Sequence, residues 1–180
     1  MKESHIRIKK IVLIGLFAAI LTGGKLALMS LPNIEVVTLF IFLFSLSFGW
    51  KMSLASVLVF CAVEVSIFGF NTWIIAYFIY WPLVALVSSF FFNRYHNNII
   101  IIIIGVFMTF LFGVITSLVD AAFAYGASGI NFFTLFFAIY ARGVLFYAVH
   151  IASNAVLMSI VFPVLHPLFL KAKIAYFNEN

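Results

Sequence analysis

The feature that most constrains this chain is the recurrence of long apolar stretches along its whole length. One of them opens with six consecutive isoleucines, Ile99 to Ile104, and continues without a charged residue to Val119. A helix crosses the hydrocarbon core of a bilayer with about 20 apolar residues. Charged residues make up 8% of the chain, against about 25% in a soluble domain. The sequence therefore predicts an integral membrane protein without a soluble domain.

Turn-forming and charged residues divide the chain into six predicted membrane helices. Leu31-Pro32-Asn33 and Gly49-Trp50-Lys51 are two of these breaks. The predicted fold is an all-α, compact bundle that forms a single membrane domain over residues 1–180. The short second span is expected to be tilted or partly interfacial. We expect spans at residues 11–30, 36–48, 52–68, 73–92, 99–119 and 143–167, and an outer loop at 120–142 that holds a short re-entrant or interfacial helix.

The basic residues predict the orientation of this bundle. With six spans, all cations except Lys25 and Arg142 fall on one side of the membrane. By the positive-inside rule, that side and both termini are cytoplasmic. The net charge of +5 then reflects topology rather than a nucleic-acid-binding surface.

The remaining charged and polar groups gather at one depth. At about 1.5 Å per helical residue, they all lie in the outer half of the membrane or at its outer surface. Ionisable residues inside a membrane are functional candidates, so we expect an outward-facing pocket for a polar or zwitterionic ligand. The alternatives are hydrogen bonds that only hold helices together, or an internal ion pair of Lys25 with Glu64. The groups concerned are Lys25, Glu35, Glu64, Asp120, Arg142, His150 and Asn154.

Three polar residues of the last apolar stretch share one helical face. Tyr147, His150 and Asn154 are spaced i, i+3 and i+7, which puts them on the same side of a helix. Hydrocarbon does not solvate such groups, so we expect them to face protein, water or a ligand.

An aromatic stripe runs along the predicted span 73–92. Trp73, Tyr77 and Trp81 recur at i, i+4 and i+8, so a planar ligand can stack on them or a cation can lie over their rings. The alternative is an aromatic belt at the membrane surface. A belt accounts better for Trp73 than for the deeper Trp81.

These patterns define a candidate binding set and disfavour several chemistries. The chain has one cysteine, Cys61, and no cysteine–histidine cluster, HExxH motif or glycine-rich phosphate loop. We therefore expect no metal site, no cofactor and no ATP binding by that route. No spacing forms a catalytic set, so we expect no enzyme activity. The candidate substrate-binding residues are Lys25, Glu35, Glu64, Asn71, Trp73, Tyr77, Trp81, Asp120, Arg142, Tyr147, His150 and Asn154.

Three stretches resemble the S components of energy-coupling factor (ECF) transporters, which are six-helix membrane proteins that bind vitamins. The first is LIGLFAAILTGGKLAL with the following LPNIEVVTLFIFLFSLSFGWK, and the second is VFCAVEVSIFGFNTW. The third, YARGVLFYAVHIASNAVL, is similar to the family's Gly-x-x-Phe-x-x-x-His-x-x-x-Asn pattern through Gly143, Phe146, His150 and Asn154.

The resemblance implies the substrate-binding subunit of a vitamin importer in the bacterial cytoplasmic membrane. Such a subunit captures its vitamin from outside, in a pocket built from loops one, three and five and the outer ends of helices four to six. It then associates with a transmembrane coupling protein and two cytoplasmic ATPases, and is thought to topple to release its cargo. Vitamin B6 or a thiamine precursor is our guess for that cargo, with pantothenate or a larger vitamin left open.

The first predicted span carries two pairs of small residues, Ala18/Thr22 and Ala19/Gly23. This small-xxx-small spacing lets another helix approach closely. In the family, small residues of the first helix contact the coupling protein, so the resemblance implies that these four residues form the docking face.

Two other functions stay open at this point. A self-sufficient carrier or channel would move its solute without partner proteins. An intramembrane enzyme would use His150, Asp120 or Glu64 as an acid or base.

Overall fold

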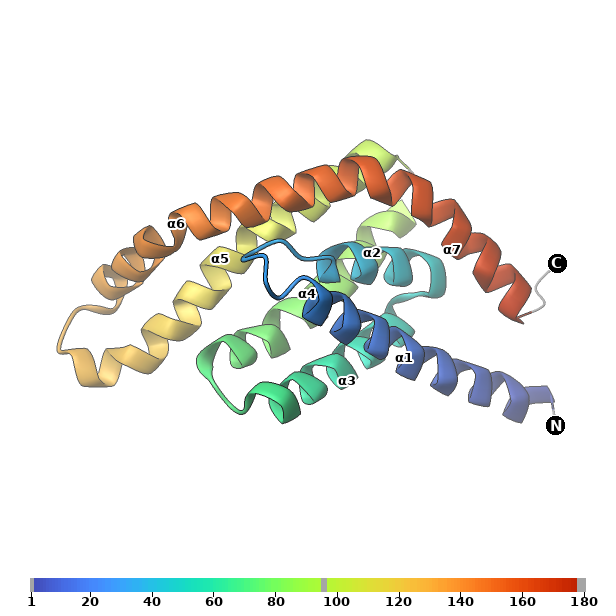
Figure 1. Ribbon diagram of the computed structural model, residues 1–180, viewed down its shortest axis with the longest axis horizontal. Coiled ribbons are helices and arrows are strands. Elements are labelled where there is room, and N and C mark those ends of the chain that lie inside the picture. Colours follow the sequence, from blue (N-terminus) through green and yellow to red (C-terminus); the bar gives the residue numbers. More distant parts are fainter. Residues whose placement is uncertain (1, 95–96, 178–180) are drawn as a thin grey trace.

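The computed structural model describes residues 2–94 and 97–177, and within them every regular element is a helix (Figure 1). α6, η1 and α7 follow one another without a break, so the described chain has six helices, the last of them bent. This confirms the predicted all-α fold. The elements are α1 (Lys2–Ala27), α2 (Val37–Phe48), α3 (Trp50–Phe68), α4 (Thr72–Arg94), α5 (Asn98–Ser128), α6 (Phe132–Val156), the π-helical turn η1 (Leu157–Val161) and α7 (Phe162–Phe177).

Five of the helices are long and apolar enough to cross a membrane, the last being the continuous 46-residue segment Phe132–Phe177. Successive helices run back and forth, and both termini lie at the same end of the bundle (Figure 1). There the Lys9 ammonium donates to the carbonyl oxygen of Tyr176 at 2.8 Å, and the Tyr176 hydroxyl donates to the carbonyl oxygen of Lys9 at 3.2 Å. The chain is a multi-pass membrane protein whose termini lie at one end of the bundle.

The remaining helix, α2, lies inside the bundle. Its 12 residues reach about 18 Å at 1.5 Å per residue, short of the hydrocarbon core of about 30 Å. It is buried on nearly all sides and packs against α1, α3, α4, α5 and α7. Of the two expectations for this span, tilted or partly interfacial, neither anticipated that α2 is enclosed by other helices. The sequence VTLFIFLFSLSF is apolar all round, and such a helix is stable when other helices enclose it.

Close contacts through small and aromatic side chains hold α2 in place. The ring of Phe44 stacks on Phe17 of α1 with centroids 3.7 Å apart. The Ser45 hydroxyl donates to the carbonyl oxygen of Ala85 at 2.7 Å, and the Ser89 hydroxyl donates to the carbonyl oxygen of Ser45 at 3.2 Å. Small hydroxyl residues allow two helices to approach and bond to each other inside a membrane.

The prediction of an outer loop at residues 120–142 is wrong. α5 runs to Ser128 and α6 starts at Phe132, so residues 129–131 alone connect them. Gly129 takes the left-handed conformation with φ 64°, and the Asn131 side chain accepts a hydrogen bond from the Phe133 amide at 3.0 Å. The uncharged segment stays helical because a helix bonds its own backbone groups where water is absent.

The last helix bends between its two halves (Figure 1). η1 is a π-helical turn, and Pro167 lies inside α7; both features interrupt the regular hydrogen-bond ladder and bend helices. As a result α6 packs against α5, whereas α7 packs against α2. The predicted span 143–167 therefore covers the middle of a longer, bent helix.

Candidate functional site

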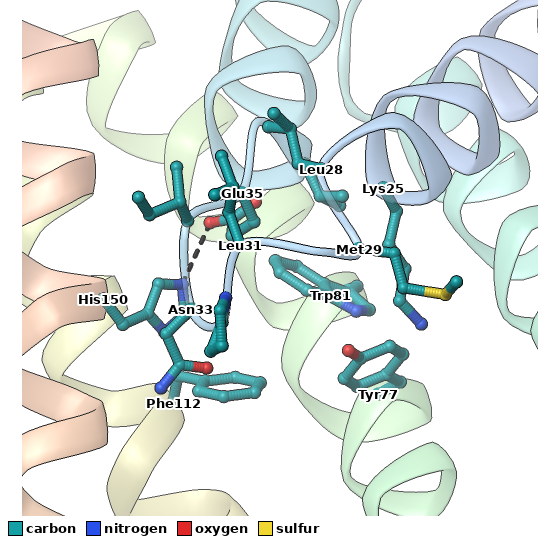
Figure 2. Close-up of a pocket in the computed structure, with 13 residues that line it drawn as sticks. Lys25, Leu28, Met29, Leu31, Asn33, Glu35, Tyr77, Trp81, Phe112 and His150 are labelled. Atoms are coloured by element: carbon teal, nitrogen blue, oxygen red, sulfur yellow. Dashed lines mark hydrogen bonds and ion pairs between the residues drawn. The ribbon is translucent and has the colours of Figure 1, made fainter.

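A cavity of about 180 Å³ lies where the segment between α1 and α2, residues 28–36, meets α4, α5 and α6. Its walls are mostly apolar, with polar groups at two ends. Figure 2 shows Lys25 and Tyr77 at one end, Glu35 and His150 at the other, and the Trp81 indole between them with its nitrogen on the Lys25 side. The lining residues are Lys25, Leu28, Met29, Leu31, Pro32, Asn33, Ile34, Glu35, Val37, Tyr77, Trp81, Phe112 and His150.

Residues 28–36 form one wall of the cavity and are fastened to α6. The Asn33 amide group donates to the carbonyl oxygen of Phe146 at 2.6 Å, and the Ser153 hydroxyl donates to the carbonyl oxygen of Asn33 at 3.1 Å. Asn33 has φ 58°, a conformation that asparagine tolerates better than most residues. This segment, which the sequence marks as a break between helices and which contains the candidate residue Glu35, therefore supplies much of the lining.

The Glu35 carboxylate joins this segment to α2 and α6. Its Oε1 accepts hydrogen bonds from Asn154 Nδ2 at 2.7 Å, His150 Nε2 at 3.0 Å and the Thr38 hydroxyl at 2.6 Å. Its Oε2 accepts from the Thr38 amide at 2.9 Å. The last bond satisfies one of the free amides in the first turn of α2. Two of the polar residues predicted to share one face of a helix thus meet at this carboxylate.

The hydrogen bonds to Glu35 affect its pKa more than its burial does. Burial alone would raise the pKa of Glu35, but the hydrogen bonds that its carboxylate accepts from His150 and Thr38 hold that pKa below its ordinary value. An ionised carboxylate only accepts hydrogen bonds, so His150 Nε2 carries the hydrogen between them. In the neutral imidazole Nδ1 is then an acceptor, and it is buried with no hydrogen-bond partner among the described residues.

At the other end, Lys25 forms an ion pair with Glu64 of α3. Glu64 is fully buried, whereas the Lys25 side chain keeps 18% of its surface exposed. The Lys25 nitrogen also lies over the rings of Phe68, Trp73 and Tyr77, at 4.6, 4.4 and 4.8 Å from their centroids. The internal ion pair that the sequence left open is formed, and the cation over the aromatic stripe is the protein's own lysine.

The aromatic stripe continues from this lysine into the cavity. The Tyr77 ring contacts Trp73 and Trp81 edge to face, with centroids 5.0 and 5.4 Å apart. Tyr77 and Trp81 line the cavity, and Trp73 does not. Trp81 is 2% exposed, so a belt at the membrane surface does not account for it. The Trp81 indole nitrogen is buried without a hydrogen-bond partner in the described part of the chain.

Several predicted site residues lie away from the cavity lining. Asn71 is a helix cap, whose side chain accepts from the Ile74 amide at 3.2 Å. The Tyr147 hydroxyl lies 2.9 Å from the Ser117 hydroxyl, between α5 and α6. Asp120 is partly exposed and Arg142 is exposed, and neither lines the cavity. Glu64 and Asn154 reach it only through their partners, Lys25 and Glu35.

Sequence reasoning missed Phe112 and the apolar residues of the segment 28–36. Phe112 forms an edge-to-face contact with the His150 ring, with centroids 4.8 Å apart. Nothing distinguishes it in sequence from the other phenylalanines, of which the chain has 24. The segment did carry a signal, because Leu28, Met29, Leu31 and Ile34 are unusually apolar neighbours for a Pro-Asn turn.

The four small residues predicted as a docking face do not share one side of α1. Ala18 is buried against the bundle, which corrects its assignment, and Thr22 is half-buried. Ala19 and Gly23 are exposed, as is Gly15. Nothing lies within 4 Å of the position that a Cβ would take at Gly15 or Gly23. The exposed stripe, here called the α1 stripe, is therefore Gly15, Ala19 and Gly23.

No protein-family model, curated protein or solved structure matches this chain. Among the described residues, no three His, Cys, Asp or Glu side chains are placed to hold a metal ion together. What can be assigned is an all-helical, multi-pass membrane protein with a cavity that has hydrogen-bonding groups at two ends.

Proposed function

We propose that this protein is the substrate-specificity subunit of an ECF-type importer. It binds a small water-soluble vitamin or vitamin precursor and passes it to an ATPase-driven partner complex in the bacterial cytoplasmic membrane. The observation that carries this proposal is the cavity itself. It is lined by aromatic rings and by two polar ends, and small-ligand sites combine apolar walls with a few placed polar groups in this way.

Binding rather than catalysis is supported by how the charged groups are used. Glu35 accepts four hydrogen bonds from the protein, and Glu64 is paired with Lys25. A general base needs a free acceptor within reach of the substrate, oriented by a third group. The Glu35 and Glu64 carboxylates are bonded to protein groups, so neither is placed as such a base, and we propose binding rather than catalysis.

Dependence on a coupling protein is supported by the α1 stripe. Gly15, Ala19 and Gly23 recur every fourth residue on an exposed face of a membrane helix, and such faces allow close packing of another helix. The partners proposed are a transmembrane coupling protein, which packs on this stripe, and two cytoplasmic ATPases that supply the energy. The sequence itself contains no glycine-rich phosphate loop.

The first test is a thermal-shift screen of the detergent-solubilised protein against water-soluble vitamins and their precursors. A ligand at about a thousand-fold excess over its dissociation constant stabilises the native state by about 4 kcal/mol, which gives a clear rise in the unfolding midpoint. Failure of every compound to shift the midpoint would contradict the proposal.

A second test separates an importer subunit from a self-sufficient carrier. The protein is reconstituted into liposomes alone and together with its coupling protein and ATPases, and uptake of the compound found in the screen is measured. The proposal requires uptake only in the complete assembly with ATP. Uptake by the protein alone would establish the carrier instead.

A further inference from the structure

The cavity has about the volume of a single ring. An apolar cavity of about 150 Å³ holds one benzene molecule, and the cavity here measures about 180 Å³. Tyr77, Trp81 and Phe112 supply aromatic walls, on which a planar ring can stack offset or edge to face. One six-membered ring with short substituents fills this space.

One end of the cavity, here called the donor end, consists of Lys25 and Trp81. The indole N–H is a donor only, and that of Trp81 has no partner within the described residues. The Lys25 ammonium has three hydrogens and is bonded to Glu64 through one oxygen. Figure 2 shows the Lys25 and Trp81 side chains reaching toward the same part of the cavity. A ligand therefore needs a hydrogen-bond acceptor at this end.

The opposite end, here called the acceptor end, is His150. Its Nε2 donates to Glu35, which leaves Nδ1 as the acceptor in the neutral ring. His150 is 2% exposed, and Nδ1 lacks a hydrogen-bond partner in the described structure. A buried polar atom without a hydrogen-bond partner destabilises the protein. An N–H or O–H group on a ligand removes that destabilisation.

The charges around the cavity disfavour a strongly anionic ligand. Lys25 is neutralised by Glu64, and the Glu35 carboxylate lies beside His150 at the acceptor end. A phosphate ester carries about −1.5 to −2 charges at neutral pH. It would meet the two carboxylates with a single lysine to compensate, in a site where water screens poorly.

We propose that the cavity binds an uncharged or zwitterionic nitrogen heterocycle of one ring, a substituted pyridine or pyrimidine, with an acceptor at one edge and a donor at the opposite edge. The cavity rejects the phosphate ester of the same compound. This inference rests on the proposed function, since it names the substrate class of the same site.

The test uses isothermal titration calorimetry on the full-length protein in detergent. The probes are pyridoxine and 4-amino-5-hydroxymethyl-2-methylpyrimidine, the phosphate ester of each, and pantothenate as an open-chain anion. At least one free heterocycle should bind, and its phosphate ester should bind at least about a hundred-fold more weakly, because the added charge meets the Glu35 carboxylate in the lining and a lysine already paired with Glu64. An ester that binds as tightly as the free compound overturns the proposal.

Two variants test the two ends of the cavity. Trp81→Phe keeps an aromatic ring but removes the N–H, and His150→Lys keeps a donor for Glu35 but carries no acceptor. Each should weaken heterocycle binding about tenfold, the effect of one lost hydrogen bond. Trp50→Phe, at an exposed position of α3 away from the lining, should bind within about twofold of the unchanged protein. Unfolding midpoints measured without ligand identify any variant that is misfolded.

The outcomes separate this proposal from the function on which it rests. Unchanged affinity in both folded variants overturns the assignment of the two ends. Binding of pantothenate in place of the heterocycles overturns the substrate class and leaves the importer subunit standing. If neither these probes nor any other water-soluble vitamin binds, both proposals fail.

Discussion

The Glu35 carboxylate accepts hydrogen bonds from Thr38 in α2 and from His150 and Asn154 in α6. One side chain therefore fastens the segment 28–36 to two helices and completes a wall of the cavity. The ionised state of Glu35 matters for the fastening and for the wall, because the protonated acid would lose part of its capacity to accept hydrogen bonds.

This dependence predicts how stability changes with pH. The pKa of Glu35 lies below its ordinary value of 4.5, so its contribution to folding is complete above that pH and is lost as the pH falls toward the lower, folded-state pKa. The unfolding midpoint of the detergent-solubilised protein should drop in this acidic window, and Glu35→Gln should flatten that part of the profile. The matched control is Glu3→Gln, an exposed carboxylate on α1, which should keep the profile of the unchanged protein. An identical acid response in Glu35→Gln would contradict this role.

The Lys25–Glu64 pair predicts a strong dependence of each residue on the other. Lys25→Met leaves the fully buried Glu64 without its cation, and breaking a buried pair in this way costs about 3–5 kcal/mol. The double variant Lys25→Met with Glu64→Leu should recover most of that loss, because no charge then stays buried. The free energy of unfolding of the single and the double variant is measured in detergent micelles by titration with a denaturing detergent. Equal losses in the single and double variants would show that the pair does not govern stability.

Prediction from sequence succeeded for residues whose arrangement follows from the helical period alone. The spacing of His150 and Asn154 placed them on one helical face, and in the structure both side chains form hydrogen bonds with Glu35. Their partner lies 115 and 119 residues away along the chain, and no local pattern reveals such a tertiary contact. Whether the lining residues bind a ligand stays a prediction.

At the scale of whole helices, apolar length was a reliable guide and glycine was not. The five long helices follow from stretches with enough apolar residues to span a bilayer. The loop expected at 120–142 rested on glycine and uncharged residues, yet Gly126 continues α5 as an ordinary helical residue. Only Gly129 has a positive φ in this region. In apolar surroundings the need to satisfy backbone hydrogen bonds overrides the weak helix propensity of glycine.

The contact between α5 and α6 predicts opposite effects for two glycines of the same helix. A Cβ at Gly113 would lie 2.7 Å from Tyr147 Cγ, so Gly113→Ala should destabilise the protein by about 1–3 kcal/mol through overpacking. Nothing lies within 4 Å of a Cβ at Gly126, and Gly126→Ala should stabilise by up to about 1 kcal/mol through helix propensity. Unfolding midpoints in detergent provide the comparison. Shifts of the same sign in the two variants would contradict the close approach at Gly113.

For the molecule as a whole, the proposed function separates ligand binding from partner docking. The cavity is built from Lys25 near the end of α1, residues 28–36, Val37 of α2, and side chains of α4, α5 and α6, whereas the α1 stripe lies on an outer face of the bundle. The two surfaces share none of their residues, so each can be altered alone.

Ala19→Leu or Gly23→Leu should therefore leave ligand affinity unchanged and abolish transport in the complete assembly. A leucine fills the shallow face on which another helix would pack but touches nothing in the cavity. Ala62→Leu, on an exposed position of α3, is the matched control and should retain transport. Calorimetry measures the binding and liposome uptake measures the transport. Full uptake by both α1 variants would remove the stripe as the docking face.

The short, enclosed helix α2 also sets an order of events while the chain is being made. At 12 residues it is too short for the bilayer to hold it across the membrane alone. The hydroxyl of Ser45 finds its partners on α4, at Ala85 and Ser89, which the ribosome adds later. Glu35, just before α2, can bond to His150 and Asn154 only after α6 has been synthesised. The cavity therefore closes only once nearly the whole chain has been synthesised, and a truncated product would enter the membrane without a binding site.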